Sequence, residues 1–374
     1  MLTAPTYPAA RLVADAVQSH FARHIAAARS GNGEKAVAPS PGAIAAIIDA
    51  AFWASLRREE GRAPRISLAF LPPGSARHPL RFASQLSLAP AVLAKVAPAA
   101  ERPGIHLGVW SDGDDYVVWG TTRDVPAFCL VIEVVTSGLI VVKHRSEPFG
   151  KFVNVAVLEG DQIKIVDEHV SVVVPDCPAV VTSLAGAPTD RGSASGLTTV
   201  LVQLAASMRA HGRGGTLLVV PHGAQEWRES IVSPMSYEVD PPYGELARLA
   251  CAASADPDDV KRAVDAVAGL TAVDGATIIS DRYDLLSFGT KITRRRGSAP
   301  VELVNVTEPV EGSTPTRATP AQLGGTRHLS AAQFVHDQRD ATALVASQDG
   351  RFTVFKWSPR ENFVHAHRVD ALLL

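Results

Sequence analysis

Two short stretches, Pro175–Pro178 and the polar run Ala187–Gly196, separate two halves of this chain with different hydrophobic patterns. Before them, short runs of alternating residues are typical of strands. After them, an amphipathic helix is followed by long apolar runs typical of buried strands. At 374 residues the chain is also too long for one typical core. We therefore predict a domain break within residues 175–195, with one domain over residues 1–185 and another over residues 190–374.

The first half predicts an α+β domain. Two Ala-rich helical patterns, over residues 1–30 and 44–56, precede a strand at 66–71 and a short helix over 86–96. From residue 105 the hydrophobic period changes to two, which begins with an Asp-Gly hairpin signal. Further strands are expected at residues 127–135, 139–143, 153–158 and 162–166. The predicted arrangement is helices packed on a mostly antiparallel sheet.

The second half predicts an α/β domain with a mixed, twisted sheet and helices on both sides. A helix over residues 197–210 passes through a Gly-Arg-Gly-Gly turn into a buried strand at 216–221. More helices are expected around 246–252 and 260–268, and strands at 278–279, 285–292, 340–347 and 352–357. The Pro- and Thr-rich stretch from Arg294 to Pro320 predicts a long loop.

Residues 323–332, Leu-Gly-Gly-Thr-Arg-His-Leu-Ser-Ala-Ala, predict a tight turn that leads into a helix. Glycines allow the backbone to approach a ligand closely. Thr326, Arg327 and His328 then offer a hydroxyl, a guanidinium and an imidazole beside the unpaired N–H groups of the helix start. This combination favours an anion such as phosphate.

A second candidate motif, Asp274-Gly275-Ala276, predicts a turn before a buried strand. A carboxylate at such a position can hold a divalent metal or orient a hydroxyl nucleophile. Taken singly, each motif also has an ordinary structural explanation: Arg327-His328 as a solvated helix start, and Asp274-Gly275 as a turn. Their order along the chain carries more information than either motif alone.

That order resembles the diadenylate cyclase family, whose signatures are Asp-Gly-Ala and Gly-Thr-Arg-His-Arg-x-Ala. The first signature is complete at residues 274–276, and the second matches at residues 325–328 and at Ala331. Leu329 stands where the family has its second arginine, and Gln348 where the family often has an acidic residue. The resemblance covers residues 197–357, and the first half would be a sensor domain that sets the output of the second.

The resemblance implies that two ATP molecules are condensed into cyclic di-AMP with release of pyrophosphate, assisted by Mg²⁺ or Mn²⁺. Asp274 would hold the metal and orient or deprotonate the 3′-hydroxyl, Arg327 would bind phosphate oxygens, and His328 would contact phosphate or assist the metal. The nucleotide-binding residues would be Gly275, Ala276, Gly325, Thr326, Arg327 and Ser330. Because the product is two-fold symmetric, family members place two such domains face to face, which implies a homodimer or higher oligomer.

A second interpretation stays open: a receptor that binds ATP or a cyclic dinucleotide in the same pocket without turnover. Leu329 and Gln348 favour it, because an arginine lost from a phosphate-handling motif weakens transition-state stabilisation more than ground-state binding. Arg317 and the run Arg294–Arg296 are the nearest residues in sequence that could replace the missing charge. The sequence does not separate ATP from other nucleotides and does not name the signal sensed.

Composition and charge argue against several other classes of protein. A net charge of −2 gives no reason to expect nucleic-acid binding. The three cysteines have neither the spacing of metal ligands nor that of a disulfide framework. No apolar run is long enough to cross a membrane and no signal peptide is indicated, so a cytoplasmic protein is expected.

Overall fold

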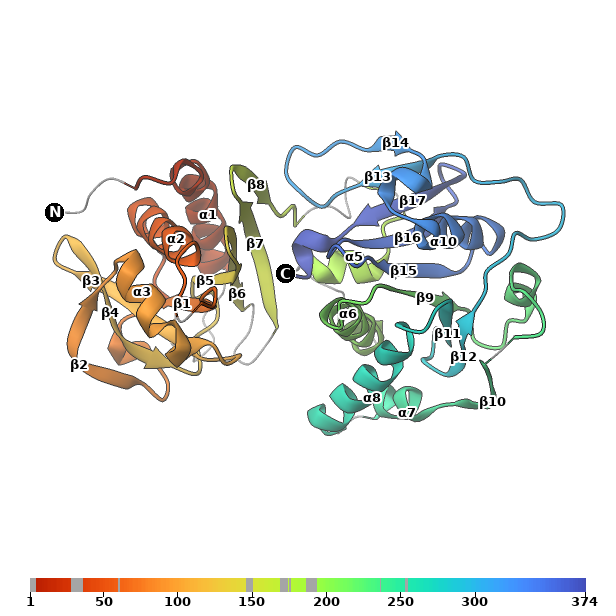
Figure 1. Ribbon diagram of the computed structural model, residues 1–374, viewed down its shortest axis with the longest axis horizontal. Helices are drawn as coiled ribbons and strands as arrows, with labels where there is room; N and C mark the ends of the chain where they lie inside the picture. Colours follow the sequence, from red (N-terminus) through yellow and green to blue (C-terminus); the bar gives the residue numbers. More distant parts are fainter. Residues whose placement is uncertain are drawn as a thin grey trace. The chain divides into compact units, whose positions relative to one another are not determined.

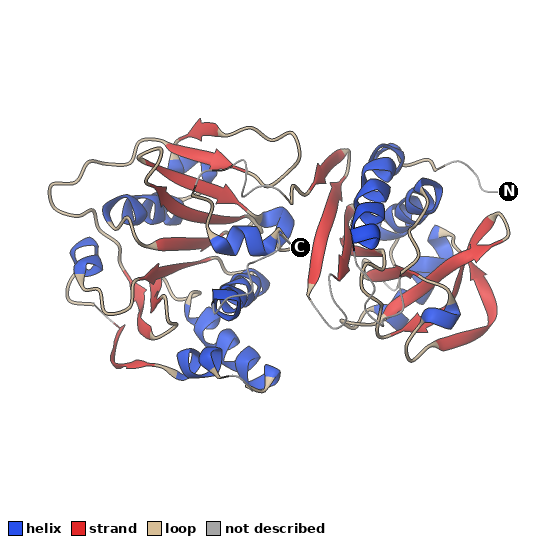
Figure 2. Cartoon of the chain, turned by 180° about the vertical axis from the view of Figure 1, so that it is seen from behind, coloured by secondary structure: helices blue, strands red, loops and turns tan. Residues whose placement is uncertain are grey.

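The computed structural model describes residues 5–27, 36–59, 61–145, 151–168, 174, 176–185, 194–235, 237–252 and 255–374, with the side chains of residues 194–199 excepted. The chain forms two compact units, one over Met1–Val166 with Leu374 and the other over Asp167–Leu373. Both units are mixed α/β, and each contains one large mixed sheet (Figures 1 and 2). Within the described residues, no helix has the length and apolar content that a membrane span requires.

The first unit is built on an eight-stranded sheet with the order β2-β4-β3-β1-β5-β6-β7-β8. Neighbouring strands are antiparallel except β1 and β3, which are parallel. The helices are α1 (Pro8–Ala27), α2 (Pro41–Ser55) and α3 (Pro90–Val96), with short 3₁₀ turns η1 (Pro73–Ser75) and η2 (Ala97–Ala100). The strands are β1 (Ile66–Phe70), β2 (Leu80–Ser87), β3 (His106–Asp112), β4 (Asp115–Thr122), β5 (Val131–Thr136), β6 (Leu139–Arg145), β7 (Phe152–Glu159) and β8 (Gln162–Ile165).

Helices α1 and α2 cover one face of this sheet. Their buried side chains share a core with Leu68, Leu107, Ile132 and Val142, which lie in β1, β3, β5 and β6 and point to the face that the two helices cover. Because successive side chains of a strand point to opposite faces, the intervening residues lie on the other face. That other face carries Ser67 and Glu133 together with a smaller apolar cluster that includes Ala69 and Val131.

The structure differs from the sequence prediction at residues 80–96. Residues 80–87 form strand β2, and the helix α3 begins only at Pro90. Strand β2 lies at the edge of the sheet and is mostly exposed, so it lacks the apolar alternation that marks a half-buried strand.

The second unit is built on a nine-stranded sheet with the order β10-β12-β11-β9-β15-β16-β17-β13-β14. Its strands are β9 (Gly215–Val220), β10 (Tyr237–Tyr243), β11 (Ala276–Ser280), β12 (Leu285–Thr290), β13 (Val304–Thr307), β14 (Thr316–Ala318), β15 (Thr342–Ala346), β16 (Phe352–Ser358) and β17 (Phe363–Arg368). Its helices are α5 (Ala179–Leu184), α6 (Ala194–Ala210), α7 (Glu245–Cys251), α8 (Pro257–Leu270), α9 (Pro320–Leu323) and α10 (Thr326–Asp337), with 3₁₀ turns η3 (Glu226–Ser230) and η4 (Asp370–Leu372).

The ends of two central strands define two sides of this sheet. Strands β9 and β11 are parallel neighbours, with Thr216 opposite Ala276 and Val220 opposite Ser280. We call the side of the sheet on which both strands begin the start edge, and the side on which both strands end the finish edge. Both terms refer to the ends of the strands and not to the outermost strands of the sheet. Helix α10 packs on one face of these strands, where Phe334 and Val335 join a core with Leu218 and Ile278. Helices α6 and α8 pack on each other elsewhere in the unit (Figure 1).

The boundary between the units lies before the predicted region. Asp176 accepts hydrogen bonds from Ser358 Oγ at 2.8 Å and from the Arg360 N–H at 3.2 Å, and α5 packs on α6. Asp176, at the start of the predicted boundary region, therefore already belongs to the second unit. Most of the polar run on which the prediction rested, residues 186–193, lies outside the described residues.

The stretch expected to be one long loop, residues 294–320, contains a hairpin. Strand β13 pairs with β14 and also, in parallel, with β17. These strands have four and three residues, too short for a hydrophobic period to be recognised in the sequence.

Candidate functional site

Asp274 lies on the turn between α8 and β11, at the start edge of the second sheet. Gly275 follows with φ +125°, and a Cβ there would lie 2.4 Å from the carbonyl carbon of Gly289. Only glycine allows this close approach of two backbones. The Asp-Gly-Ala sequence thus bends the chain so that the Asp274 side chain stays in solvent while Ala276 enters the buried strand.

The Asp274 carboxylate is ionised and faces two cations. Its side chain is 91% exposed, and Oδ2 accepts a hydrogen bond from Lys291 Nζ at 2.7 Å. The bond and charge of Lys291, and to a smaller extent the charge of Arg327, hold the pKa of this carboxyl below its ordinary value. Asp274 precedes β11 and Arg327 lies against the turn that precedes the parallel strand β9, so these two residues, well separated in the sequence, lie on the same side of the sheet.

Arg327 is positioned by the Gly-Arg-Gly-Gly turn that precedes β9. Gly214 has φ +70°, and a Cβ there would lie 3.0 Å from Arg327 Nη1 and 3.4 Å from Gln348 Cγ. Gln348 Nε2 in turn donates to the Arg213 carbonyl oxygen at 3.3 Å. The starts of β9 and α10 and the turn after β15 therefore converge around the Arg327 guanidinium.

The first turn of α10 presents its backbone to solvent. Gly325 is the N-cap and its neighbour Thr326 begins the helix, and both residues are exposed. Leu329, in the same turn, has 45% of its surface exposed, whereas Ser330 is half-buried. The helix is long enough for its dipole and free N–H groups to favour an anion at this end.

His328 is placed differently from Arg327. It is 1% exposed, its Nε2 lies 3.3 Å from Thr353 Oγ1, and its ring packs edge-on to Phe355. A Cβ on Gly324 would lie 2.3 Å from His328 Nδ1, so the ring fills the space that this glycine leaves. The His328 ring faces the core, and this burial disfavours the expected contact with phosphate or metal.

Burial of His328 predicts a pH dependence of stability. Burial lowers the pKa of His328 to about 4, and burial together with His365 lowers the pKa of His367 to about 3. The unfolded chain, with ordinary histidine pKa values, binds more protons than the folded one below about pH 6.5, so stability falls as the pH falls. We expect about 2 kcal/mol per histidine to be lost between pH 7 and pH 5, measured by urea unfolding of the second unit.

His328→Gln, which cannot take up a proton, should remove its share of this pH dependence. Equal dependence in the wild type and the variant would contradict a neutral, buried His328.

Two features of the start edge were not expected from the sequence. Lys291 reaches Asp274 because it follows β12, whose Thr290 lies opposite Ala276. Tyr237 stacks on Phe288 with ring centroids 4.9 Å apart, is 50% exposed, and lies over Gly289. The exposed Tyr237 ring, which stacks on the half-buried Phe288 beside the Asp274 turn, is a surface on which a nucleobase can stack. Lys291 could have been identified only by predicting that β12 pairs with β11, because this pairing brings Thr290, its neighbour in the chain, opposite Ala276.

The arginines nearest in sequence to the second motif lie far from it. The N–H of Arg295 donates to Asp337 Oδ2 at 2.9 Å, at the other end of α10, about 17 Å along the helix axis from Thr326. Arg317 lies on β14, over the Phe363 ring. Four strands, β15, β16, β17 and β13, lie between β14 and β9 in the sheet. Within the described residues of one chain, neither Arg317 nor Arg295 is placed to replace the arginine missing at position 329.

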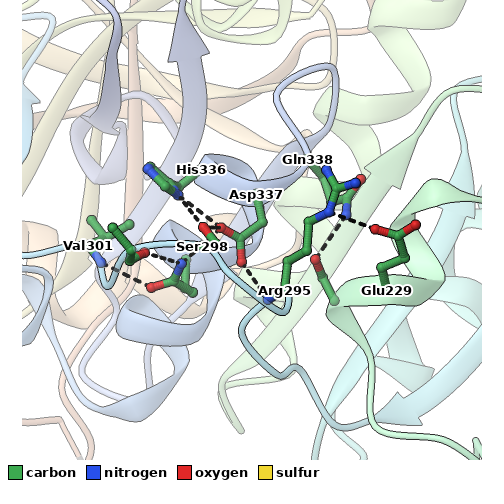
Figure 3. A network of polar contacts seen from close by, with 10 residues as sticks. Glu229, Arg295, Ser298, Val301, His336, Asp337 and Gln338 are labelled. Carbon is green, nitrogen blue, oxygen red and sulfur yellow. Dashed lines mark hydrogen bonds and ion pairs between the residues drawn. The ribbon is translucent and has the colours of Figure 1, made fainter.

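The finish edge contains a pocket of about 690 Å³, and its lining includes Arg295, Ser298, His336 and Asp337. These residues take part in the network of polar contacts drawn in Figure 3. The Asp337 side chain is fully buried and accepts hydrogen bonds from the Arg295 N–H, Ser298 Oγ and, at 3.0 Å, Gln333 Nε2. His336 Nδ1 lies 2.9 Å from Asp337 Oδ1. Because its acceptor capacity is occupied by protein donors, Asp337 holds the 294–301 segment in place rather than awaiting a ligand.

Comparisons with known proteins cover part of the chain. No curated protein matches it. One matching solved structure, the crystal structure of a hypothetical membrane spanning protein from Bacillus cereus, shares 13% identity with a TM-score of 0.26, over 45% of this chain and 62% of that one. The chain thus spans less than two thirds of that protein, and at this TM-score the similarity supports no statement on function.

A family match is confined to the first unit and agrees with the sensor role expected for the first half of the chain. Residues 33–123 match the family described as the probable sensor domain DACNV.

Proposed function

We propose that the second unit is a diadenylate cyclase-like nucleotide site that condenses two ATP molecules into cyclic di-AMP, and that the first unit regulates it. The single observation that carries this proposal is that Asp274, just before β11, and Arg327, against the Gly214 turn just before β9, lie on the same side of the sheet, because β9 and β11 are parallel neighbours. Both motifs of the family resemblance thereby contribute a charged side chain to the same side of the sheet. The DACNV match over residues 33–123 supports a regulatory first unit.

In this proposal each charged group has one task. Arg327 and the exposed first turn of α10 bind phosphate oxygens, and the Tyr237–Phe288 pair supports the base. Asp274 orients the 3′-hydroxyl of the nucleotide toward the α-phosphate of the second nucleotide. One copy of the unit offers half of a two-fold symmetric arrangement, so the reaction requires a face-to-face pair.

The donor set fits Mg²⁺ or Mn²⁺ held by one protein carboxylate together with nucleotide phosphates. Asp274 supplies an ionised oxygen ligand, and the exposed Lys291 pair contributes little stability and can be displaced. When bound, the metal would neutralise phosphate charge during pyrophosphate departure. His328 does not fit as a ligand, and we assign it instead to positioning the turn that carries Arg327.

The direct test is incubation of the pure chain with ATP and Mg²⁺ or Mn²⁺, followed by mass analysis of the products. Cyclic di-AMP, with a rate that rises more steeply than linearly with protein concentration, is the expected result. Binding of ATP without product under either metal would reject turnover and leave the receptor interpretation.

Leu329→Arg should raise the rate of cyclic di-AMP formation, by roughly ten-fold, because it adds a guanidinium where phosphate charge gathers. Leu329 is 45% exposed, so stability should change by no more than about 0.5 kcal/mol. The matched variant Leu329→Gln, which adds polarity without charge, should behave like the wild type. An equal gain in both variants would show that the charge is not the missing element.

The receptor interpretation is the second candidate, and one contact favours it. Lys291 occupies the Asp274 carboxylate at 2.7 Å, where a cyclase needs a metal. In a receptor this ion pair would persist with nucleotide bound, and affinity for ATP would not depend on Mg²⁺ or Mn²⁺.

A further inference from the structure

The first unit contains a pocket of about 330 Å³ on the face of its sheet that α1 and α2 do not cover. Ser67, His106, Glu133 and Lys143 occupy the strand positions between the core residues, so they point to this face. The pocket is lined by residues 65–67, 100–106, 133–134, 143, 145 and 152. Its volume is at the lower end of the range of small-molecule sites.

Among the described residues, two nitrogen atoms in this lining have no acceptor. The Nε2 atom of His106 and the Nε atom of Arg145 are buried and make no hydrogen bond within the described residues. His106 is 3% exposed, and its Nδ1 lies 2.7 Å from Ser67 Oγ. Buried polar groups are nearly always paired, so unsatisfied donors in a cavity indicate a missing acceptor.

His106 is neutral in this pocket and can donate one hydrogen bond. Burial, with the charges of Lys143 and Arg145, lowers the pKa of His106 to about 4, so the ring is neutral at physiological pH. A neutral ring carries one N–H. In the tautomer in which the Ser67 hydroxyl donates to Nδ1, that proton sits on Nε2, the atom without an acceptor among the described residues.

The charge of the lining favours an anion. Four basic side chains, from Arg65, Arg102, Lys143 and Arg145, face two acidic ones, from Glu101 and Glu133. The Phe152 ring holds two of the cations in place, with Lys143 Nζ at 4.9 Å and Arg145 Cζ at 4.5 Å from its centroid. Glu133 already pairs with Lys143, which leaves Arg145 with the greater share of uncompensated charge.

We propose that this pocket binds a small molecule carrying an oxyanion, either a carboxylate or a phosphate, that accepts hydrogen bonds from His106 Nε2 and Arg145. Ser67 and His106 lie within residues 33–123, the part that matches a probable sensor domain, so the ligand would be the signal of the first unit. Coupling of this ligand to cyclic dinucleotide output rests on the proposed function; binding itself does not.

The test is calorimetric titration of the full chain with inorganic phosphate and, separately, with benzoate, at low and constant ionic strength without nucleotide. One of the two should bind saturably, and which one does identifies the oxyanion. Arg145→Gln should weaken that binding about ten- to hundred-fold, as expected for loss of a charge-assisted hydrogen bond. Arg145→Lys, which keeps the charge, should lie between Arg145→Gln and wild type.

Two controls separate this site from others. Lys95→Gln removes one exposed positive charge on α3, outside the lining, and should leave affinity unchanged. Because Arg327 is itself proposed to bind phosphate, the phosphate titrations of the wild-type pocket and of Arg145→Gln are compared in an Arg327→Ala background, where the candidate nucleotide site does not contribute. Far-UV circular dichroism checks that Arg145→Gln is folded. Failure of both anions to bind, or wild-type affinity in folded Arg145→Gln, would overturn the proposal, whatever the outcome of the cyclase assay.

Discussion

Asp274→Asn is expected to lower the rate of cyclic di-AMP formation on the order of 10²–10³-fold, the loss typical when one charge-stabilising group is removed from an active site. The amide keeps the size of the side chain but loses the negative charge that would hold the metal and orient the hydroxyl. Because the side chain is 91% exposed, stability should be almost unchanged. The measurements are product formation by mass, ATP affinity and the urea midpoint.

The control for this prediction is Glu311→Gln, which neutralises an exposed carboxylate elsewhere in the second unit. It should leave the rate at the wild-type level. If Asp274→Asn retained wild-type activity, Asp274 would be only a turn residue paired with Lys291, and the Asp-Gly-Ala resemblance would have no catalytic meaning.

Asp337→Ala is expected to lower the free energy of unfolding of the second unit by about 3 kcal/mol, since it leaves several buried donors without an acceptor. The N–H of Arg295, Ser298 Oγ and Gln333 Nε2 all donate to this carboxylate (Figure 3). Urea unfolding at pH 7, followed by a probe confined to the second unit, measures the change. The segment from Arg295 to Val301 should also become more accessible to protease.

Asp337→Asn is the matched variant, because it keeps the shape and one acceptor oxygen. It should lose clearly less stability than Asp337→Ala. Equal losses in the two variants would mean that the negative charge, rather than the number of accepted hydrogen bonds, holds the network together. Unchanged stability in both would contradict a structural role for the finish-edge network.

Local sequence patterns predicted those elements whose physical cause is local. The period-two runs of β3 to β8 identify half-buried strands, and Gly275 marks a turn that a side chain would block. The short strands β13 and β14 escaped prediction because they are stabilised by pairing with each other and with distant β17. Such pairing leaves no periodic signal in a few residues.

The sequence by itself determined which chemical groups this protein has at its candidate sites: a carboxylate on a glycine turn and an arginine at a helix start. Only the tertiary structure decided that Asp274 and Arg327 lie on the same side of the sheet, that Lys291 pairs with Asp274, and that Arg295 lies at the opposite sheet edge. It also decided that His328 is buried while its neighbour Arg327 reaches the sheet edge. The physical reason is that a helix presents adjacent residues to different sides, and which side meets the core depends on packing against distant strands.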